Sequence, residues 1–139
     1  MANERPSDSR SAISFAWFPA AEWRTAVTLW PDLLEERPAD PIEYSHVMES
    51  HFKAMSRLMA GTQLHVSPMT CDGLVEHAAG SDYDAGSGEA RAGYAAALLS
   101  RGVGVPWPPR RNDECWCRSG MRYKECCGPV PPAEYPDRA

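Results

Sequence analysis

The sequence predicts a mainly α-helical protein, with a small body of about four helices followed by a compact cysteine-rich module near the C-terminus. Three observations lead to this fold class. Apolar residues recur at helical spacing in several segments. Proline and glycine stand at the ends of those segments, where helices begin and stop. Four of the five cysteines lie between positions 115 and 127, whereas the preceding body holds one.

The first predicted helix follows Pro19, a residue that suits a first helical turn. Its sequence, AAEWRTAVTLW, places apolar side chains on one stripe with helical spacing, and Pro31 ends or kinks it. The stripe consists of Phe18, Trp23, Val27 and Trp30, with Ala26 as an alternative to Trp30. This pattern is typical of an amphipathic helix.

The second predicted helix runs from Pro41 to about Ala60 and has the clearest start. Asp40 suits the N-cap, Pro41 the first helical position and Glu43 the third, as in a capping box. The stripe predicts that one face packs on the core, and it comprises Tyr44, Val47, Met48, Phe52, Met55, Leu58 and Met59.

The rest of the body predicts a short extended segment and two further helices. Residues 64–67, LHVS, suit the extended segment. One helix is expected from about residues 68–72 to Gly80, and another from Ser87 or Gly88 to Ser100. Cys71 stands alone at the start of the third helix. A buried structural thiol is the favoured interpretation, and a reactive thiol is the alternative.

The chain divides into five segments by composition. Residues 103–109 favour an extended polyproline connector, whose Trp107 is expected to dock on the body or the module. No run approaches the roughly 18 apolar residues of a membrane span, and the N-terminal stretch does not read as a signal peptide. The predicted segments are a disordered tail over 1–12, a helical body over 13–102, the connector over 103–109, the cysteine module over 110–128 and a disordered tail over 129–139.

The cysteines of the module form two pairs: Cys115 with Cys117, and Cys126 with Cys127. The first pair puts two thiolates on one turn, and the second can close the other side of a tetrahedron, which is the arrangement that structural zinc prefers. Disulfides within so short a segment would be strained, and a redox dithiol is more usually spaced CxxC. A metal site is therefore favoured, with a redox or disulfide role and a catalytic thiolate as alternatives. Reduced thiols also suit the cytoplasm.

The stretch from Arg110 to Gly128, RRNDECWCRSGMRYKECCG, resembles the SEC-C zinc-binding motif, known from the C-terminal tail of the SecA translocation ATPase. The family pattern runs roughly RNDxCxCGSGxKYKxCCG. Arg122 replaces a lysine, and Arg118 stands where glycine is usual; a side chain there costs about 1 kcal/mol if the backbone has positive φ. The matching positions are Arg111, Asn112, Asp113, Cys115, Cys117, Ser119, Gly120, Tyr123, Lys124, Cys126, Cys127 and Gly128.

By this resemblance, Cys115, Cys117, Cys126 and Cys127 bind one structural Zn²⁺, so the module is a zinc knuckle. The resemblance also implies docking on a protein partner, in a setting linked to preprotein translocation, a chaperone or the ribosome. Aromatic residues and arginine dominate interface hot spots, so exposed side chains of the module are the expected contacts. They are Arg111, Trp116, Arg118, Met121, Arg122, Tyr123 and Lys124. A purely structural role, in which the two aromatic rings cover the metal cluster, is an equal alternative for Trp116 and Tyr123.

Two other functions remain open at this point. The first is a nucleic-acid-binding module, with ribosomal RNA as the ligand, in which the basic residues contact phosphates and Trp116 or Tyr123 stacks on bases. Against it, the chain has a net charge of −5, and the basic residues of the module also serve to offset thiolate charge. The second is a redox-responsive zinc switch, which would release its metal on mild oxidation.

Enzymatic activity is not expected from this sequence. No GxxxxGK[ST] phosphate loop occurs in it, and no residues suggest a small-molecule substrate. Four cysteine ligands saturate tetrahedral zinc and leave no position for water or substrate. The sequence therefore predicts a binding protein.

Overall fold

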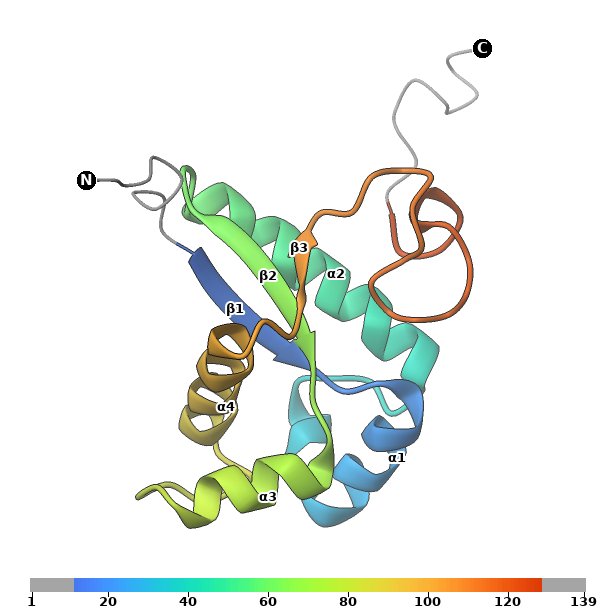
Figure 1. The fold of residues 1–139 in the computed structure, drawn as a ribbon. Coiled ribbons are helices and arrows are strands. Elements are labelled where there is room, and N and C mark those ends of the chain that lie inside the picture. The colour runs from blue at the N-terminus through green and yellow to red at the C-terminus, as the bar shows by residue number, and fades with distance from the viewer. Residues whose placement is uncertain (1–11, 129–139) are drawn as a thin grey trace, which may run out of the picture.

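The structure is a computed structural model, and it describes residues 12–128 (Figure 1). This part of the chain contains four α-helices and a three-stranded mixed sheet. The predicted disordered tails lie outside this range, apart from Ala12, which begins a strand. In chain order the elements are β1 (Ala12–Trp17), α1 (Ala20–Leu29), the 3-10 helix η2 (Pro31–Glu35), α2 (Pro41–Leu58), β2 (Gln63–Pro68), α3 (Cys71–Ala79), α4 (Gly88–Ser100), β3 (Val105–Trp107) and the 3-10 helix η3 (Tyr123–Glu125).

The prediction of a mainly α-helical fold is wrong, because the body is built on a sheet. The extended segment expected at 64–67 is confirmed as the central strand β2, with β1 and β3 as its neighbours. Residues 12–17 pair in parallel with β2 over their whole length. The proline-rich connector supplies the antiparallel strand β3, in which Pro106 occupies an edge position that tolerates the missing amide proton.

The four predicted helices are all present, and their ends follow the residues that predicted them. The Asp40 carboxylate accepts hydrogen bonds from the amides of Ile42 and Glu43, so it caps α2 as expected. Pro31 ends α1 and begins the short η2. Thr70 and Ser87 cap α3 and α4 in the same way as Asp40 caps α2.

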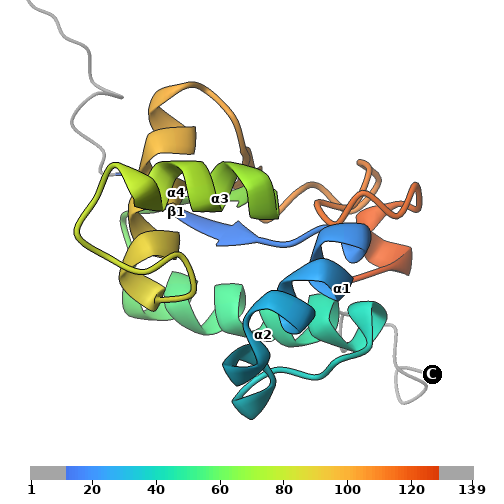
Figure 2. The same ribbon diagram turned by 90° about the horizontal axis from the view of Figure 1, so that it is seen from below.

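Helices cover both faces of the sheet. In Figure 2, α3 lies on one side of β1 and α2 lies on the other, and α4 packs against β1. The core between these layers includes Trp17, Trp23 and Phe52, each almost inaccessible to solvent. Trp23 stacks on Tyr44 with ring centroids 3.9 Å apart, and burial raises the pKa of Tyr44 to about 12. The cysteine module packs against this body.

The connector carries the chain from β3 to the cysteine module, which lies against α2 (Figure 1). Trp107 is buried, as the sequence predicted, and its ring contacts Phe52 of α2. Within residues 12–128, every helix is too short or too polar to cross a lipid bilayer.

Candidate metal centre

The four thiols of the module meet at one point. The Sγ atoms of Cys115, Cys117, Cys126 and Cys127 all lie within 4.8 Å of one another. The sulfurs of Cys117 and Cys126 are 3.4 Å apart, and those of Cys126 and Cys127 are 3.9 Å apart. Tetrahedral zinc with sulfur ligands at about 2.3 Å places those sulfurs roughly 3.8 Å apart. The cluster therefore has the dimensions of a four-thiolate metal site, and its cysteines are free of disulfides.

Short backbone pairings bring the two cysteine pairs together. Glu114 and Arg122 form an antiparallel bridge, and beside it the Cys115 amide donates to the Met121 carbonyl at 2.9 Å. The Tyr123 amide donates to the Asp113 carbonyl at 2.8 Å, which fixes the start of η3. The second cysteine pair follows directly from this turn. The scaffold of the site is thus a tight loop closed by main-chain hydrogen bonds.

The four thiols influence one another through short contacts. Hydrogen bonds from Cys115 and Cys127 lower the pKa of Cys117, whereas contacts with Cys115 and Cys117 raise the pKa of Cys127. The Ser119 hydroxyl oxygen lies 3.2 Å from the Cys126 sulfur. Four sulfurs this close repel one another strongly as thiolates, so full ionisation requires a cation. A divalent ion that favours thiolate ligands supplies that charge.

Arg118 adopts the left-handed conformation at the position where the family pattern has glycine. Its φ is 66°, and no other non-glycine residue between 12 and 128 has a positive φ. The turn carries the chain from the first cysteine pair towards Gly120, which has a φ of 90°. The backbone strain that the sequence comparison suggested at Arg118 is therefore present.

Replacing Arg118 by glycine is expected to stabilise the protein by up to about 1 kcal/mol, because glycine adopts positive φ without a Cβ clash. The greater freedom of glycine in the unfolded chain offsets part of this gain. The free energy of unfolding of the metal-loaded protein in urea measures the effect. Arg118→Ala is the matched control, since it removes the guanidinium but keeps Cβ. An equal gain in both variants would assign the effect to the arginine charge instead of the backbone.

The structure separates the predicted partner contacts into two groups. Trp116 and Tyr123 are only 4% and 5% exposed, so the expectation that they lie at the surface is wrong. The side chain of Met121 is 48% exposed. The basic residues Arg111, Arg118 and Arg122 are exposed as well, and Lys124 is half-buried. The two aromatic rings are therefore part of the core, and only the remaining residues are accessible.

One buried carboxylate joins the cysteine module to the body. Glu49 of α2 is 7% exposed. Its Oε1 accepts hydrogen bonds from the indole Nε1 of Trp107 at 3.1 Å and of Trp116 at 2.9 Å. Its Oε2 accepts a hydrogen bond of 2.6 Å from the Tyr123 hydroxyl. Burial, followed by the bond to Glu49, raises the pKa of Tyr123, which keeps the phenol protonated as a donor. The carboxylate thus fixes three donors that come from the connector and the module.

Apolar contacts reinforce this junction. The Trp116 ring meets Trp17 edge to face at a centroid distance of 4.9 Å, and it meets Phe52 in the same way at 5.1 Å. The Cys127 thiol lies 3.8 Å from the Ser45 hydroxyl of α2. Consequently, the cysteines share one continuous hydrophobic core with the sheet and α2. Packing against β1 and α2 therefore fixes the position of the site.

Glu49 was not recognised in the sequence, although a signal for it exists. Ser45 and Glu49 follow Tyr44 and Met48 directly and lie four residues apart, so they border the predicted apolar stripe of α2. Both are buried. A charged residue at the margin of an apolar stripe is ordinarily solvated, and only the docking of the module buries this one.

Cys71 lies apart from the cluster, at the first turn of α3. It is 3% exposed, and its thiol donates to the Glu22 carbonyl at 3.4 Å. Burial is the main cause that raises the pKa of this thiol to about 12. The prediction of a buried cysteine is confirmed, and its thiol is protonated at neutral pH.

Comparison with known proteins identifies the module. The family model of the SEC-C motif matches residues 111–129. No curated protein and no solved structure matches the chain. The SEC-C motif binds zinc in general, and the clustered thiols of this chain fit such an ion. Motif and geometry therefore agree in supporting zinc binding.

Proposed function

We propose that this chain is a zinc-binding interaction protein whose SEC-C module docks on a protein partner. One Zn²⁺, held by Cys115, Cys117, Cys126 and Cys127, would be structural. The observation that supports this most strongly is the closed cluster of four sulfurs on the body. Four thiolates leave no coordination position for water or substrate, which favours a structural ion over a catalytic one.

The accessible face of the module suits a protein ligand. Met121 and the guanidinium groups of Arg118 and Arg122 are exposed there. A groove of about 700 Å³ lies between this module and the connector. It combines proline rings with charged groups, and it is lined by Val105, Pro106, Pro108, Pro109, Arg110, Asp113, Glu114, Cys115, Trp116 and Arg118. Apolar side chains interspersed with arginine are typical of protein interfaces, and the mixture of Arg110 and Arg118 with Asp113 and Glu114 suits a partner that carries charges of both signs.

The geometry supports nucleic-acid binding less well. Stacking on unpaired bases requires exposed aromatic faces. Trp116 and Tyr123, the two rings expected to stack, are buried and therefore inaccessible to bases. The arginines alone would give a salt-sensitive, sequence-independent contact. By its resemblance to the SecA tail, we place the protein partner in a translocation, chaperone or ribosome setting in the cytoplasm.

The proposal is tested with the full chain immobilised in its zinc-loaded form and exposed to a nuclease-treated cytoplasmic extract. We expect retention of one or a few proteins at moderate ionic strength, identified by mass spectrometry and then confirmed with the purified partner. The double variant Met121→Ser/Arg118→Ala is expected to weaken binding of that purified partner about tenfold or more.

The matched control for this experiment is Leu58→Ser/Arg57→Ala, which removes another exposed apolar and basic pair, at the end of α2. It is expected to bind the partner as the wild type does. Equal weakening by both double variants, or retention that occurs only from an extract without nuclease treatment, would contradict docking through the module.

A further inference from the structure

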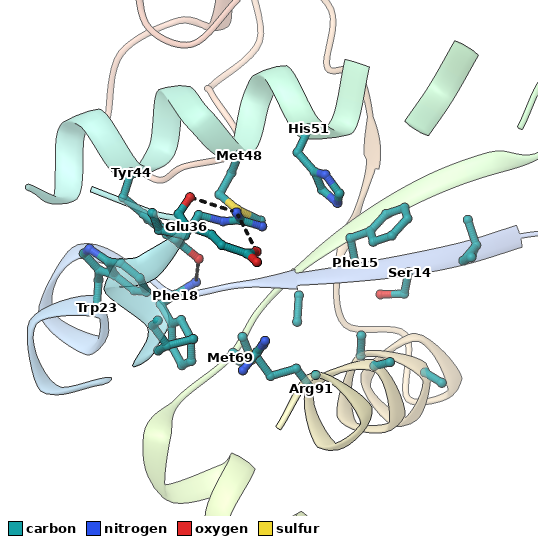
Figure 3. Close-up of a pocket in the computed structure, with 18 of the residues that line it drawn as sticks. Ser14, Phe15, Phe18, Trp23, Glu36, Tyr44, Met48, His51, Met69 and Arg91 are labelled. Atoms are coloured by element: carbon teal, nitrogen blue, oxygen red, sulfur yellow. Dashed lines mark hydrogen bonds and ion pairs between the residues drawn. The ribbon is translucent and has the colours of Figure 1, made fainter. Parts of the chain in front are cut away.

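A groove runs along the free edge of β1, on the opposite side of this strand from β2. Figure 3 shows β1 between two helices, with Tyr44, Met48 and His51 pointing towards it from α2 and Arg91 from α4. The groove has a volume of about 660 Å³ and is lined by five consecutive residues of β1, from Ala12 to Ala16. It belongs to the body and contains no residue of the cysteine module.

The register of β1 shows which backbone groups face this groove. The Trp17 carbonyl accepts from the Met69 amide at 2.8 Å, so the polar groups of Trp17 point towards β2. Backbone groups of alternate residues in a strand point to opposite sides, so those of Ser14 and Ala16 point away from β2. The Phe18 amide, on that same side, donates to the Tyr44 hydroxyl at 3.0 Å. Because β1 is the end strand, no strand among residues 12–128 pairs with Ser14 and Ala16 there.

The walls of the groove leave room for side chains of an added strand. On the α4 side the lining consists largely of small residues: Gly88, Ala92, Ala95 and Ala96. On the α2 side Phe15 packs against His51, and Met48 lies beside them. An extended chain sends alternate side chains to opposite faces, so one set would enter the space above α4 and the other would meet this aromatic wall.

One end of the groove carries the guanidinium of Arg91, which forms no ion pair within residues 12–128, although Glu36 and Glu89 lie in its surroundings. Arg91 is half-buried and donates to the Gly86 carbonyl at 3.0 Å, and among residues 12–128 no carboxylate is within ion-pair distance of it. Arg37 lies near it and contacts its neighbour Glu36 at 3.9 Å, and Asp32 also lines this end. Burial lowers the pKa of Arg91, as expected for a cation that has lost part of its hydration. A ligand carboxylate would compensate Arg91 for the hydration that it has lost.

The two helices beside the groove also limit what kind of ligand can reach the edge of β1. β1 lies between α2 and α4, so only a single extended chain has access to its edge. A folded partner, such as a second copy of this chain, could offer the edge strand of its own sheet. The helices that cover such a sheet would then clash with α2 and α4. We propose that this groove binds a single extended polypeptide segment of another protein, added as a fourth strand beside β1, with alternate large apolar side chains and a carboxylate near Arg91.

The test uses the full chain and a fluorescein-labelled hexapeptide, Ser-Leu-Ser-Leu-Ser-Leu, with a free C-terminal carboxylate, followed by fluorescence polarisation. We expect saturable binding that weakens about tenfold when alternate peptide nitrogens are methylated on the edge facing β1, because the main-chain bonds are lost. We also expect Arg91→Gln to weaken binding of the peptide with a free C-terminal carboxylate about tenfold, and to leave the affinity for the C-terminally amidated peptide unchanged.

Two variants of the protein locate the binding. Ala92→Trp fills the groove from α4 and is expected to abolish binding, whereas Ala21→Trp, on an exposed part of α1 away from the groove, is the matched control. Ala16→Pro removes one outward amide without touching the ladder to β2, since proline is tolerated where the amide faces away from the sheet. It is expected to reduce affinity about tenfold while circular dichroism remains unchanged.

Three outcomes would overturn the proposal: no peptide binding by the folded wild type, binding that Ala92→Trp leaves intact, or a concentration-dependent dimer that Ala92→Trp disrupts. The last would identify a second copy as the occupant. None of these outcomes bears on zinc or on the module surface, because Met121→Ser/Arg118→Ala lies outside the groove and is expected to bind the peptide normally.

Discussion

Replacing Glu49 by alanine is expected to lower the free energy of unfolding by about 3–4 kcal/mol, because the indoles of Trp107 and Trp116 and the Tyr123 hydroxyl then lose their acceptor inside the core. A cavity at the former carboxylate adds to that cost. Urea unfolding of the zinc-loaded protein, followed by tryptophan fluorescence, measures the change.

The isosteric variant separates charge from shape. Glu49→Gln keeps an acceptor for the indoles but loses the negative charge, so we expect a smaller cost of about 1–2 kcal/mol. Glu43→Ala, on the exposed face at the start of the same helix, serves as the control and is expected to cost less than about 1 kcal/mol. A cost for Glu49→Ala no larger than that of Glu43→Ala would refute the role of this carboxylate as the junction.

Removing the metal is expected to have the second large effect. In comparable zinc peptides, metal binding contributes an apparent 10–16 kcal/mol, roughly, to folding. Chelation under reducing conditions should therefore unfold the loop around the four cysteines, expose Trp116 and lower the melting temperature by about 10 °C or more. Purified protein is expected to contain one zinc per chain. Emission of the buried tryptophans should shift to the red when the ion is removed.

A thiol titration provides the internal control for this experiment. With zinc bound, a thiol reagent is expected to find almost no reactive cysteine, since Cys71 is buried and has a pKa of about 12. Chelation should release four thiols and denaturation the fifth. Returning Zn²⁺, but not Mg²⁺, should restore protection and melting temperature. Metal-free protein with unchanged melting behaviour would exclude a structural ion.

Local signals in the sequence were sufficient for the helices. Proline at the first helical position, a capping Asp40 and apolar spacing around Tyr44 and Phe52 are short-range features, and they placed α2 within two residues of its observed end. The cysteine spacing likewise predicted a cluster that the structure brings together. In both cases the interacting residues are close in the sequence.

The strands and the junction could not be obtained in this way. β1 pairs with a strand about fifty residues later, and its six residues carry no alternation that distinguishes them from an apolar helix start. β3 was not recognised because it contains Pro106 and is followed directly by Pro108 and Pro109, and prolines normally argue against a strand. The burial of Glu49 and of the rings of Trp116 and Tyr123 depends on docking between segments that are distant in the chain. Propensity contains no information about such contacts.

The carboxylate of Glu49 also has an evolutionary consequence. Substitution of any one of its three donors leaves the acid with fewer partners, and loss of the acid leaves the donors unsatisfied, so tolerated changes at these four positions should occur together. In lineages that lose the four cysteines, the module would no longer bury Glu49, so we expect the constraint on this residue to relax. A motif acquired by gene fusion would not bring Glu49 with it, since that residue lies in the host helix. The SEC-C segment and α2 of this chain are therefore expected to have a shared history of substitution.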